Sequence, residues 1–144
     1  HKICRLYTAD SDAHNDLFQE ITIQLWKAFP KFRGESKFST WAYRVALNTA
    51  ITLYRKSTRS VNTVTYEAQQ HLFVQDEYNH EEEERLKLMY QAVQQLNDIE
   101  KALVYMYLED KDYTEIAETL GISEVNARVK MNRIKGKLIK ILNP

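Results

Sequence analysis

Lysine and arginine side chains are concentrated in two segments of this 144-residue chain. Residues 31–60 carry seven basic side chains and one acidic side chain, which gives a net charge of +6. Residues 121–144 carry six basic side chains and one acidic side chain, which gives a net charge of +5. Residues 61–120 carry fourteen acidic and four basic side chains, and residues 1–30 carry four acidic and three basic ones, so the formal net charge of the chain is zero. Clustered positive charge attracts phosphates whatever the total charge is. The two segments therefore predict contact with nucleic acid, although solvated helix faces would explain each charge taken singly.

The chain shows no set of residues that would support catalysis or bind a metal. It contains no recognisable nucleophile–base pair and no glycine-rich phosphate loop. His1 and Cys4 are close in sequence, but no second Cys/His pair completes a zinc set. We therefore expect no enzyme, no metal and no other cofactor. The single cysteine also excludes an internal disulfide and is typical of a reducing cytoplasm, and no apolar run approaches the roughly 18 residues of a membrane span.

The elements that carry the first basic segment are predicted to be helices. Apolar residues at helical spacing predict a helix over residues 16–29, which ends at Pro30 because proline cannot continue it. The same spacing predicts a second long helix that begins near Phe38, with Ser36 or Ser39 as its N-cap. No strand-like alternation of any length occurs in the sequence, so we expect an all-α protein.

Two further helices are predicted before the second basic segment. The acidic run Glu81–Glu84 predicts the start of one, because acidic side chains stabilise the positive end of a helix, and its apolar face would consist of Leu86, Met89, Tyr90, Val93 and Leu96. The other would be capped by Asn97 or Asp98, with Ile99, Ala102, Leu103, Met106 and Tyr107 inward. Residues 58–80 have few periodic apolar residues, which predicts a linker between two small helical domains, residues 1–57 and 81–144.

A helix-turn-helix motif is predicted at the second basic segment. Asp112 would cap a short helix with Ile116 and Leu120 inward, Gly121 would end it in the left-handed conformation, and Ser123 would cap a basic helix. This pattern is typical of DNA recognition. The buried side of the basic helix is predicted to be Val125, in part Val129, Ile134, Leu138 and Ile141, which leaves Arg128, Lys130, Asn132, Arg133 and Lys137 to face a duplex. Arg and Asn suit guanine and adenine edges, and Lys suits phosphates. A helical hairpin with a solvated basic face is the alternative.

A third surface is predicted on the helix over residues 16–29. Three polar side chains of this helix lie beside two apolar side chains that are not fully part of its buried apolar stripe. The set consists of Asp16, Gln19, Glu20, Ile23 and Trp26. Tryptophan near charged groups is a common anchor of protein interfaces. A surface without a partner is the alternative for this helix alone.

Together these segments resemble one family. "DLFQEITIQLWKAFPKFRGESKFSTWAYRVALNTAITLYRK" is similar to the second conserved region of bacterial RNA polymerase sigma factors of the extracytoplasmic-function (ECF) group, approximately D-x-x-Q-E-x-F-x-x-x-W…F-x-G-x-S-x-F-x-T-W-L-x-x-I-A-x-N. The helix-turn-helix resembles the family's fourth region, and the resemblance covers residues 4–142 apart from the linker. The chain departs from the family at Thr22, at Ala42, at Leu96-Asn97 in place of Leu-Pro, and at Asn126 to Lys130, where "N-A-R-V-K" replaces the commoner "G-T-V-K-S-R". Most of the family's first helix is missing upstream of His1, so we expect an incomplete N-terminus.

The resemblance implies an initiation factor without an active site, which binds core RNA polymerase and promoter DNA in the cytoplasm. It implies that Asp16, Gln19, Glu20, Ile23 and Trp26 bind the clamp helices of the largest polymerase subunit. It implies contacts to the −10 element, as that element melts, by Lys31, Arg33, Gly34, Glu35, Ser36, Lys37, Tyr43, Arg44 and Asn48, and contacts to the −35 element by Ser123, Asn126, Arg128, Lys130, Asn132, Arg133 and Lys137. An inhibitory anti-sigma factor is a further partner that the resemblance suggests, whereas no small-molecule substrate and no insertion into a membrane are expected.

The basic loop at Lys31–Lys37 fits the chemistry of strand opening. Stacking of an unpaired base is worth about 1–3 kcal/mol, and each step of duplex stacking lost on opening costs about 1.4 kcal/mol, so captured bases would offset much of a short melted tract. Gly34 permits close approach of the backbone. On the following helix we expect Trp41 to be mostly core support for the loop and Asn48 to make a polar contact to DNA, while Tyr43 would suit either role.

Two other classes of protein remain as alternatives. A helix-turn-helix regulator that acts without replacing the sigma subunit would bind a palindromic duplex site by itself, with residues 1–60 serving to dimerise or to sense. A helical adaptor that binds only protein would have no affinity for DNA, and its partner binding would not depend on salt.

Overall fold

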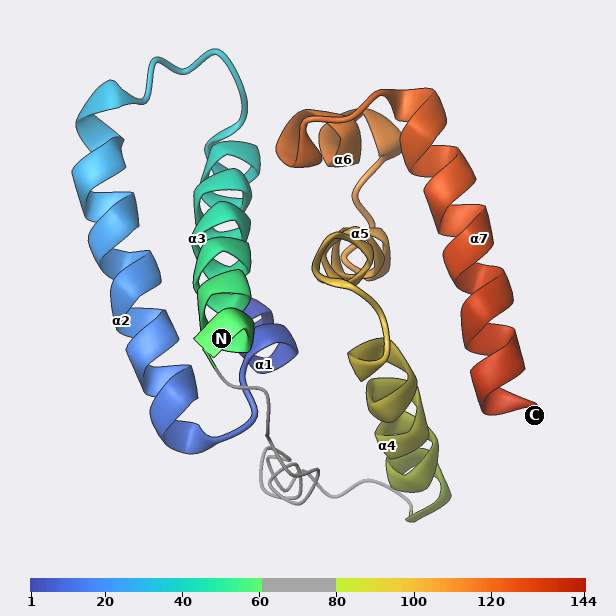
Figure 1. The fold of residues 1–144 in the computed structure, drawn as a ribbon. Helices are drawn as coiled ribbons and strands as arrows, with labels where there is room; N and C mark the ends of the chain where they lie inside the picture. Colours follow the sequence, from blue (N-terminus) through green and yellow to red (C-terminus); the bar gives the residue numbers. More distant parts are fainter. Residues whose placement is uncertain (61–79) are drawn as a thin grey trace. The chain divides into compact units, whose positions relative to one another are not determined.

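The computed structural model describes residues 1–60 and 80–144 of the chain. All regular elements in these two ranges are helices, as Figure 1 shows, so the predicted all-α fold is confirmed. The chain divides into two compact units, one on each side of residues 61–79. The predicted linker, residues 58–80, falls mainly on that intervening stretch and therefore lies outside the described residues.

The N-terminal unit consists of three α-helices and a short 3-10 helix. These are α1 (Lys2–Tyr7), α2 (Ser11–Ala28), the 3-10 helix η1 (Phe29–Lys31) and α3 (Phe38–Ser60). The long helices α2 and α3 pack side by side, joined at one end by the loop after η1, and α1 packs on both of them (Figure 1). The core contains Ile3, Cys4, Leu6, Tyr7, Leu17, Ile21, Ala46, Leu47, Ala50 and Ile51.

In this unit α3 begins where the sequence predicted, whereas α2 begins earlier than expected. Asp10 caps α2 by accepting a hydrogen bond from the Ala13 amide at 2.8 Å, so α2 begins well before residue 16. The short helix α1 was not predicted. Helix α3 begins at Phe38, which places Ser39 inside the helix, while the Ser36 hydroxyl donates to the Lys37 carbonyl at 3.4 Å. Neither of the two serines proposed as its N-cap accepts the capping hydrogen bond. Pro30 lies in η1, directly after the end of α2, as the sequence predicted.

The C-terminal unit consists of four helices. These are α4 (His80–Gln94), α5 (Asp98–Leu108), α6 (Tyr113–Leu120) and α7 (Glu124–Leu142). Helix α7 packs against the other three, and α5 also packs against α6. The largest apolar contributions to the core come from Val93, Leu96, Leu103, Val104, Met106, Ile116, Met131, Ile134 and Leu138.

The predicted inward faces of three helices in this unit need correction. On α4, Leu86 and Tyr90 are exposed, because only the last turns of this helix contact the core through Ala92 and Val93. On α5, Lys101 and Val104 are buried, whereas Ile99 is half-buried and Tyr107 lies at the surface.

On α7, the buried stripe is Ala127, Met131, Ile134 and Leu138. Val125 and Val129, predicted to lie on the buried side, fall outside this stripe and are 71% and 42% exposed. Leu120 of α6 and Ile141 of α7, both expected inward, are half-buried.

The structure also bears on metals and membranes. Within residues 1–60 and 80–144 no group of three or more His, Cys, Asp or Glu side chains is arranged to hold a metal ion. Cys4 is a buried free thiol whose pKa is raised by burial. In the same ranges no helix is both long and apolar enough to cross a membrane.

Candidate polymerase and nucleic-acid interfaces

Helices α5, α6 and α7 each begin at a side-chain cap, as the sequence predicted. Asn97 is the cap of α5, and it forms a capping box with Glu100, in which each side chain accepts a hydrogen bond from the other residue's amide at 2.9 and 3.2 Å. Asp112 accepts from the Glu115 amide at 2.8 Å, and Ser123 accepts from the Asn126 amide at 3.1 Å. Such caps satisfy amides that have no partner within the helix. The caps therefore fix where each helix of the motif starts.

The turn between α6 and α7 has the predicted helix-turn-helix geometry. Gly121 adopts φ 67° and ψ 35°, the left-handed conformation that glycine reaches without steric cost. The amides of Gly121 and Ile122 both donate to the Ala117 carbonyl, the second at 3.1 Å. Ser123 then caps α7, so two residues separate the glycine from the first turn of the basic helix.

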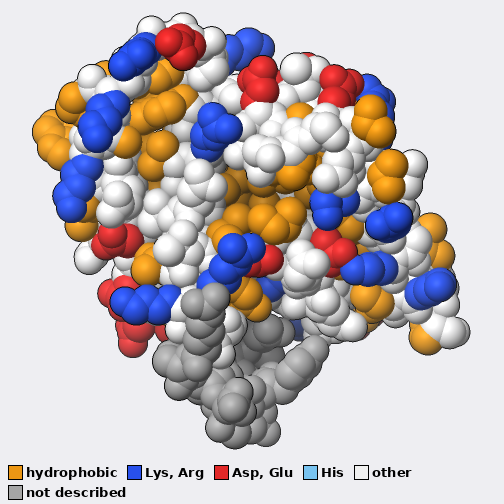
Figure 2. Space-filling model, turned by 45° about the horizontal axis from the view of Figure 1, so that its top comes forward, with side chains coloured by type: hydrophobic (Ala, Val, Ile, Leu, Met, Phe, Trp, Pro, Cys, Tyr) orange, Lys and Arg blue, Asp and Glu red, His pale blue; other side chains and the backbone are white. Residues whose placement is uncertain are grey.

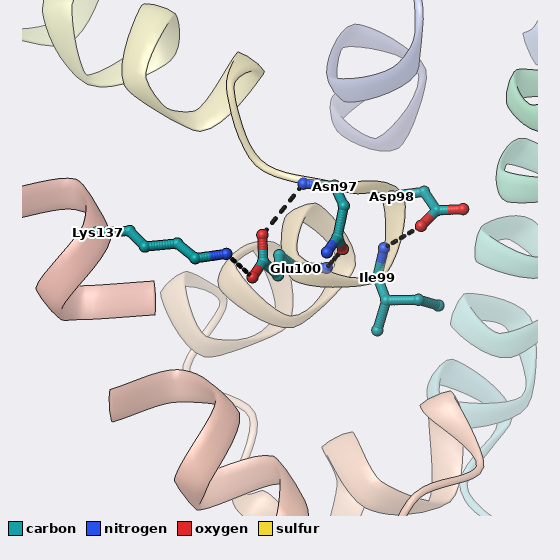
Figure 3. Close-up of polar contacts among 5 residues, drawn as sticks. All are labelled: Asn97, Asp98, Ile99, Glu100 and Lys137. Carbon is teal, nitrogen blue, oxygen red and sulfur yellow. Dashed lines mark hydrogen bonds and ion pairs between the residues drawn. The ribbon is translucent and has the colours of Figure 1, made fainter. Parts of the chain in front are cut away.

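Lys137 belongs to the scaffold of this unit. Its ammonium group pairs with the Glu100 carboxylate, whose other oxygen accepts the Asn97 amide in the capping box (Figure 3). The pair joins the C-terminal half of α7 to the start of α5, across 37 residues of sequence. The ion pair thus links α7 to α5, a contact that the sequence did not indicate.

One flank of α7 carries cations that rest on aromatic rings. Arg128 pairs with Glu124 at 2.7 Å and lies 4.5 Å from the centroid of the Tyr113 ring. The hydrogen bond from Arg128, helped by one from Thr114, holds the pKa of the Glu124 carboxyl below its ordinary value. The guanidinium is therefore oriented by its surroundings before any DNA arrives.

Lys135 extends this flank and was not among the predicted site residues. Its ammonium donates to the Tyr107 hydroxyl at 3.1 Å and lies 4.6 Å from the centroid of that ring. The hydrogen bond raises the pKa of Lys135. Its spacing of seven residues from Arg128, two helical turns, is the sequence signal that would have identified it.

The remaining predicted −35 residues of α7 differ in how exposed their side chains are. Asn126, Asn132 and Arg133 are exposed, whereas Lys130 is half-buried. Ser123 itself is exposed, but its hydroxyl oxygen accepts the capping hydrogen bond. The exposed amide and guanidinium groups retain the donors and acceptors that recognise base edges.

In the N-terminal unit the loop after η1 presents its polar side chains to solvent. Lys31, Arg33, Glu35 and Lys37 are exposed, and Ser36 is half-buried. Gly34 adopts φ 70°, and a Cβ built on it would meet nothing within 4 Å. The predicted −10 residues of the loop therefore lie together on the surface.

Two side chains of α3 add a polar stripe to this loop. Arg44 and Asn48 are exposed and lie one helical turn apart on the same face, and Tyr43 is half-buried. The structure thus places the predicted −10 residues on the loop and on the N-terminal half of α3 (Figure 1).

Four aromatic rings bracket the loop. The Trp41 ring lies 5.0 Å from Phe32, before the loop, and 5.5 Å from Phe38, after it, and Phe29 completes the cluster at 6.4 Å. Aromatic pairs at such distances stabilise one another by about 0.5–1.5 kcal/mol. Trp41 is half-buried and holds the two ends of the loop together, so its predicted supporting role fits this geometry.

Helix α2 exposes the third predicted surface. Asp16, Gln19, Ile23 and Trp26 are exposed, and Trp26 reaches 83%. Glu20 is half-buried and accepts a hydrogen bond from the Gln24 side chain at 2.9 Å. Asp16 and Glu20 are four positions apart and Ile23 and Trp26 are three positions apart, so these side chains follow one face of the helix.

An open apolar groove of about 580 Å³ continues this surface toward the loop. It is lined by Thr22, Ile23, Leu25, Trp26, Lys27, Phe29, Phe38 and Trp41. Figure 2 shows hydrophobic side chains in this part of the molecule, at the upper left, with Lys and Arg side chains around them. Ile23 and Trp26 belong to both the α2 surface and the groove, so the α2 surface continues into the aromatic cluster that brackets the loop.

Comparison with known proteins agrees with this arrangement. Residues 1–60 match the family described as Sigma-70 region 2, and residues 86–138 match the family described as Sigma-70, region 4. The chain belongs to the RNA polymerase sigma factor family. It is a sigma factor of the ECF type, which binds core RNA polymerase and directs promoter-specific transcription initiation, with region 2 at the −10 element and region 4 at the −35 element.

Curated relatives cover the whole of this sigma factor. It is 30% identical to the RNA polymerase sigma-H factor of Pseudomonas aeruginosa over 100% of this chain and 82% of the relative. It is 26% identical to the ECF RNA polymerase sigma-E factor of Haemophilus influenzae over 90% of this chain and 74% of the relative. These relatives are sigma factors, which are not enzymes.

A solved structure shares the fold. The sigma factor RpoE of Bartonella quintana, determined in complex with the anti-sigma factor NepR, superposes with a TM-score of 0.77 at 16% identity. The match covers 98% of this chain and 88% of that chain. The likeness shows that the two chains have the same fold.

Proposed function

We propose that three surfaces of this sigma factor carry its promoter-directing activity. Helix α2 binds the polymerase, the loop after η1 with the start of α3 captures the opening −10 element, and α7 reads the −35 duplex. We assign residues 1–57 to region 2, residues 58–80 to the linker and residues 81–144 to region 4. The observation that carries the proposal is the exposed polar face of α7, set at a fixed angle by the Gly121 turn and the Ser123 cap.

The polymerase-binding surface consists of Asp16, Gln19, Glu20, Ile23 and Trp26. A tryptophan that is 83% exposed, with an isoleucine one turn away, is unfavourable in water and fits the buried centre of a protein interface. The polar members would form the rim of that interface. The clamp helices of the largest polymerase subunit are the partner we assign to this face.

The −10 surface consists of Lys31, Arg33, Gly34, Glu35, Ser36, Lys37, Tyr43, Arg44 and Asn48. Exposed cations on the loop and on α3 suit the phosphates of a displaced strand. The positive φ of Gly34 allows the backbone to approach a base closely. The aromatic cluster beneath keeps the loop ends together while its polar tip adapts to unpaired bases.

The −35 surface consists of Ser123, Asn126, Arg128, Lys130, Asn132 and Arg133, and Lys135 joins it. The Ser123 end of α7 is a helix N-terminus, which favours phosphate contact. Lys137 acts by positioning α7 through its pair with Glu100. Asn126, Asn132 and Arg133 are the side chains available to base edges.

We further propose that the protein works in the cytoplasm and that an anti-sigma factor regulates it. The Bartonella quintana sigma factor of the same fold was determined with such an inhibitor bound. The exposed Ile23 and Trp26 make the polymerase-binding face a surface that an inhibitor would compete for.

Reconstituted transcription tests the proposal. The chain, mixed with core polymerase and genomic DNA, should yield transcripts from a defined set of start sites that share two spaced elements. Absence of promoter-specific transcripts would refute it. A footprint that forms on a palindromic duplex without core polymerase would favour a conventional helix-turn-helix regulator, and partner binding without DNA affinity would favour an adaptor.

A further inference from the structure

The outward face of α7 carries two exposed valines. Val125 and Val129 lie one helical turn apart and are 71% and 42% exposed. Asn132 and Gly136 continue the same stripe at the i+7 and i+11 positions. The stripe points away from the buried residues Ala127, Met131, Ile134 and Leu138.

This stripe is uncharged although α7 is strongly basic. Arg128 and Lys135 lie along one side of it, and Arg133 and Lys140 lie along the other. In Figure 2, hydrophobic side chains lie among Lys and Arg side chains along the right-hand edge, where α7 lies in Figure 1. Flanking cations with an uncharged centre match a major groove, which has phosphates at its edges and base edges on its floor.

The composition of the stripe is not explained by the stability of the helix. Valine is a weaker helix former than alanine, and glycine in a helix interior costs about 1 kcal/mol relative to alanine. A Cβ added to Gly136 would meet nothing within 4 Å, so packing inside the protein does not require glycine there. An external partner that approaches this face closely would account for both features.

We propose that Val125 and Val129 read thymine methyl groups in the −35 element and so contribute to promoter specificity. This inference rests on the proposed placement of α7 in the major groove. The C5 methyl of thymine is the apolar group among the base-edge groups of that groove, and apolar side chains recognise it. Both valines lie in the N-terminal half of the helix, the part that contacts bases in helix-turn-helix proteins.

The spacing of the two valines predicts the spacing of the thymines. Four residues rise about 6 Å along a helix, which is close to two base-pair steps of about 3.4 Å each. The segment Asn126 to Lys130, which contains Val129, also departs from the family's common "G-T-V-K-S-R".

Replacement of thymine by deoxyuridine tests the proposal, because it removes the methyl group and nothing else. In a promoter mapped by reconstituted transcription, each thymine of the −35 element is replaced in turn on either strand, and binding by the holoenzyme is titrated. Burial of one methyl group is worth about fourfold in affinity. We expect a loss of about three- to fivefold at one or two positions with the unmodified chain, and no loss with the V125A V129A double variant.

Ile139→Ala provides the matched control, since Ile139 is an exposed aliphatic residue near the other end of α7. This variant should keep the full effect of deoxyuridine. The double variant should remain folded because both valines are exposed, and the methyl NMR signal of the buried Met131 checks this.

The inference would be overturned by the absence of any deoxyuridine effect, by an equal effect in the double variant, or by a −35 element made only of G·C pairs. A double variant that loses binding equally on thymine and deoxyuridine templates also overturns it, because the valines would then contact something other than the methyl group, such as a protein. In each case promoter-specific transcription by the unmodified chain would leave the proposed function standing, whereas its absence would refute the function itself.

Discussion

Helices α5, α6 and α7 of the C-terminal unit begin at Asn97, Asp112 and Ser123, each of which accepts a hydrogen bond from an amide of the first turn. The segment between α2 and α3 of the N-terminal unit is constructed differently. Its 3-10 helix has no side-chain cap, and its polar residues face solvent around Gly34. The aromatic cluster around Trp41 anchors both ends of the segment.

The contrast matches the two forms of DNA that we propose the units bind. A duplex has a regular groove, so a helix held at a fixed angle can match it before contact and avoid the free-energy cost of ordering on binding. Melted bases have no regular shape, and a polar loop between fixed ends can adapt to them. The difference suggests that the C-terminal unit selects DNA by preorganisation and the N-terminal unit by adjustment.

The largest expected effect concerns the proposed polymerase-binding surface on α2, which lies in the N-terminal unit. Trp26→Ala should weaken binding of core polymerase by about 2 kcal/mol or more, roughly 30-fold, because exposed tryptophans are frequent interface hot spots. Titration of labelled chain with core polymerase measures this loss. The variant should fold normally, since Trp26 is mostly exposed. Ile139→Ala in the C-terminal unit is the control, and equal weakening by both variants would contradict the assignment.

Single arginine substitutions should distinguish the proposed −35 surface from the proposed −10 surface, with effects of about tenfold. Arg133→Ala should lower the affinity of the initial complex with duplex promoter, since one Arg contact to a base or phosphate is worth about 1–3 kcal/mol. Arg33→Ala should leave that affinity unchanged and slow the opening of the −10 element. Kinetics of promoter binding and of permanganate-reactive thymines measure the two steps.

Arg85→Ala, an exposed arginine of α4 outside both basic segments, controls for net charge in that comparison. If both test variants impaired the same step, the division of roles between loop and helix would be wrong.

The two glycines with positive φ allow the two units to be compared directly by the same substitution, with a smaller expected effect. Gly121→Ala should destabilise the C-terminal unit by about 1–2 kcal/mol, because two hydrogen bonds to the Ala117 carbonyl hold the turn in the left-handed conformation. Gly34→Ala should destabilise the N-terminal unit by less, about 1 kcal/mol or below, because a shift of the exposed loop can relieve part of the strain that alanine meets at the positive φ.

The tryptophan and methionine residues of the chain distinguish unfolding of the two units in a urea titration of the full chain. Both tryptophans lie in the N-terminal unit and all three methionines lie in the C-terminal unit. Tryptophan fluorescence and methionine methyl NMR signals therefore report unfolding of each unit separately. Equal losses for the two glycine variants would contradict the view that only the helix-turn-helix is rigidly held.

The smallest expected effect is a pH dependence confined to the C-terminal unit. Lys101 is 1% exposed and donates to the Gln94 side chain at 2.9 Å, and burial lowers its pKa below 10.5, although Asp98 opposes the shift. Between the lowered pKa and 10.5 the unfolded chain binds more protons than the folded chain, so the free energy of unfolding rises with pH in that window. Lys101→Leu should remove this rise, as followed by the Met106 methyl signal.

Lys87→Leu, at an exposed site on α4, should keep the rise with pH. A Lys101→Leu variant with the same pH dependence as the unmodified chain would show that this lysine is solvated in solution.

Much of the C-terminal motif could be predicted because its signals are local. Asp112, Gly121 and Ser123 act on amides or dihedral angles within a few residues, and the structure places all three as expected. The amphipathic spacing of α2 and α3 was likewise sufficient to predict two long helices. Helix starts that depend on a residue outside the periodic stretch, such as Asp10 before α2, were missed.

Other features of the site depended on contacts between distant residues. Lys137 looked like one of several exposed cations, but Glu100, 37 residues away, engages it in the structure. Val125 and Val129 looked like core residues, because α7 has apolar residues on more than one face and spacing alone does not say which face the other helices cover. Lys101 carries a charge that would normally place it at the surface, yet its position on α5 buries it.

By itself the sequence determined the all-α class, the helix-turn-helix with its caps and its glycine turn, and the family, because these depend on residue type and short-range spacing. Only the tertiary structure decided which cations are held within the fold, which apolar side chains of α7 face outward, and how the aromatic cluster closes the ends of the basic loop. The physical reason is that burial and pairing are set by which helix faces meet, and that choice is made by packing of the whole unit. The sequence pattern placed Val125 and Val129 of α7 on the buried side, and the structure exposes them. Our proposal for thymine recognition depends on that exposure.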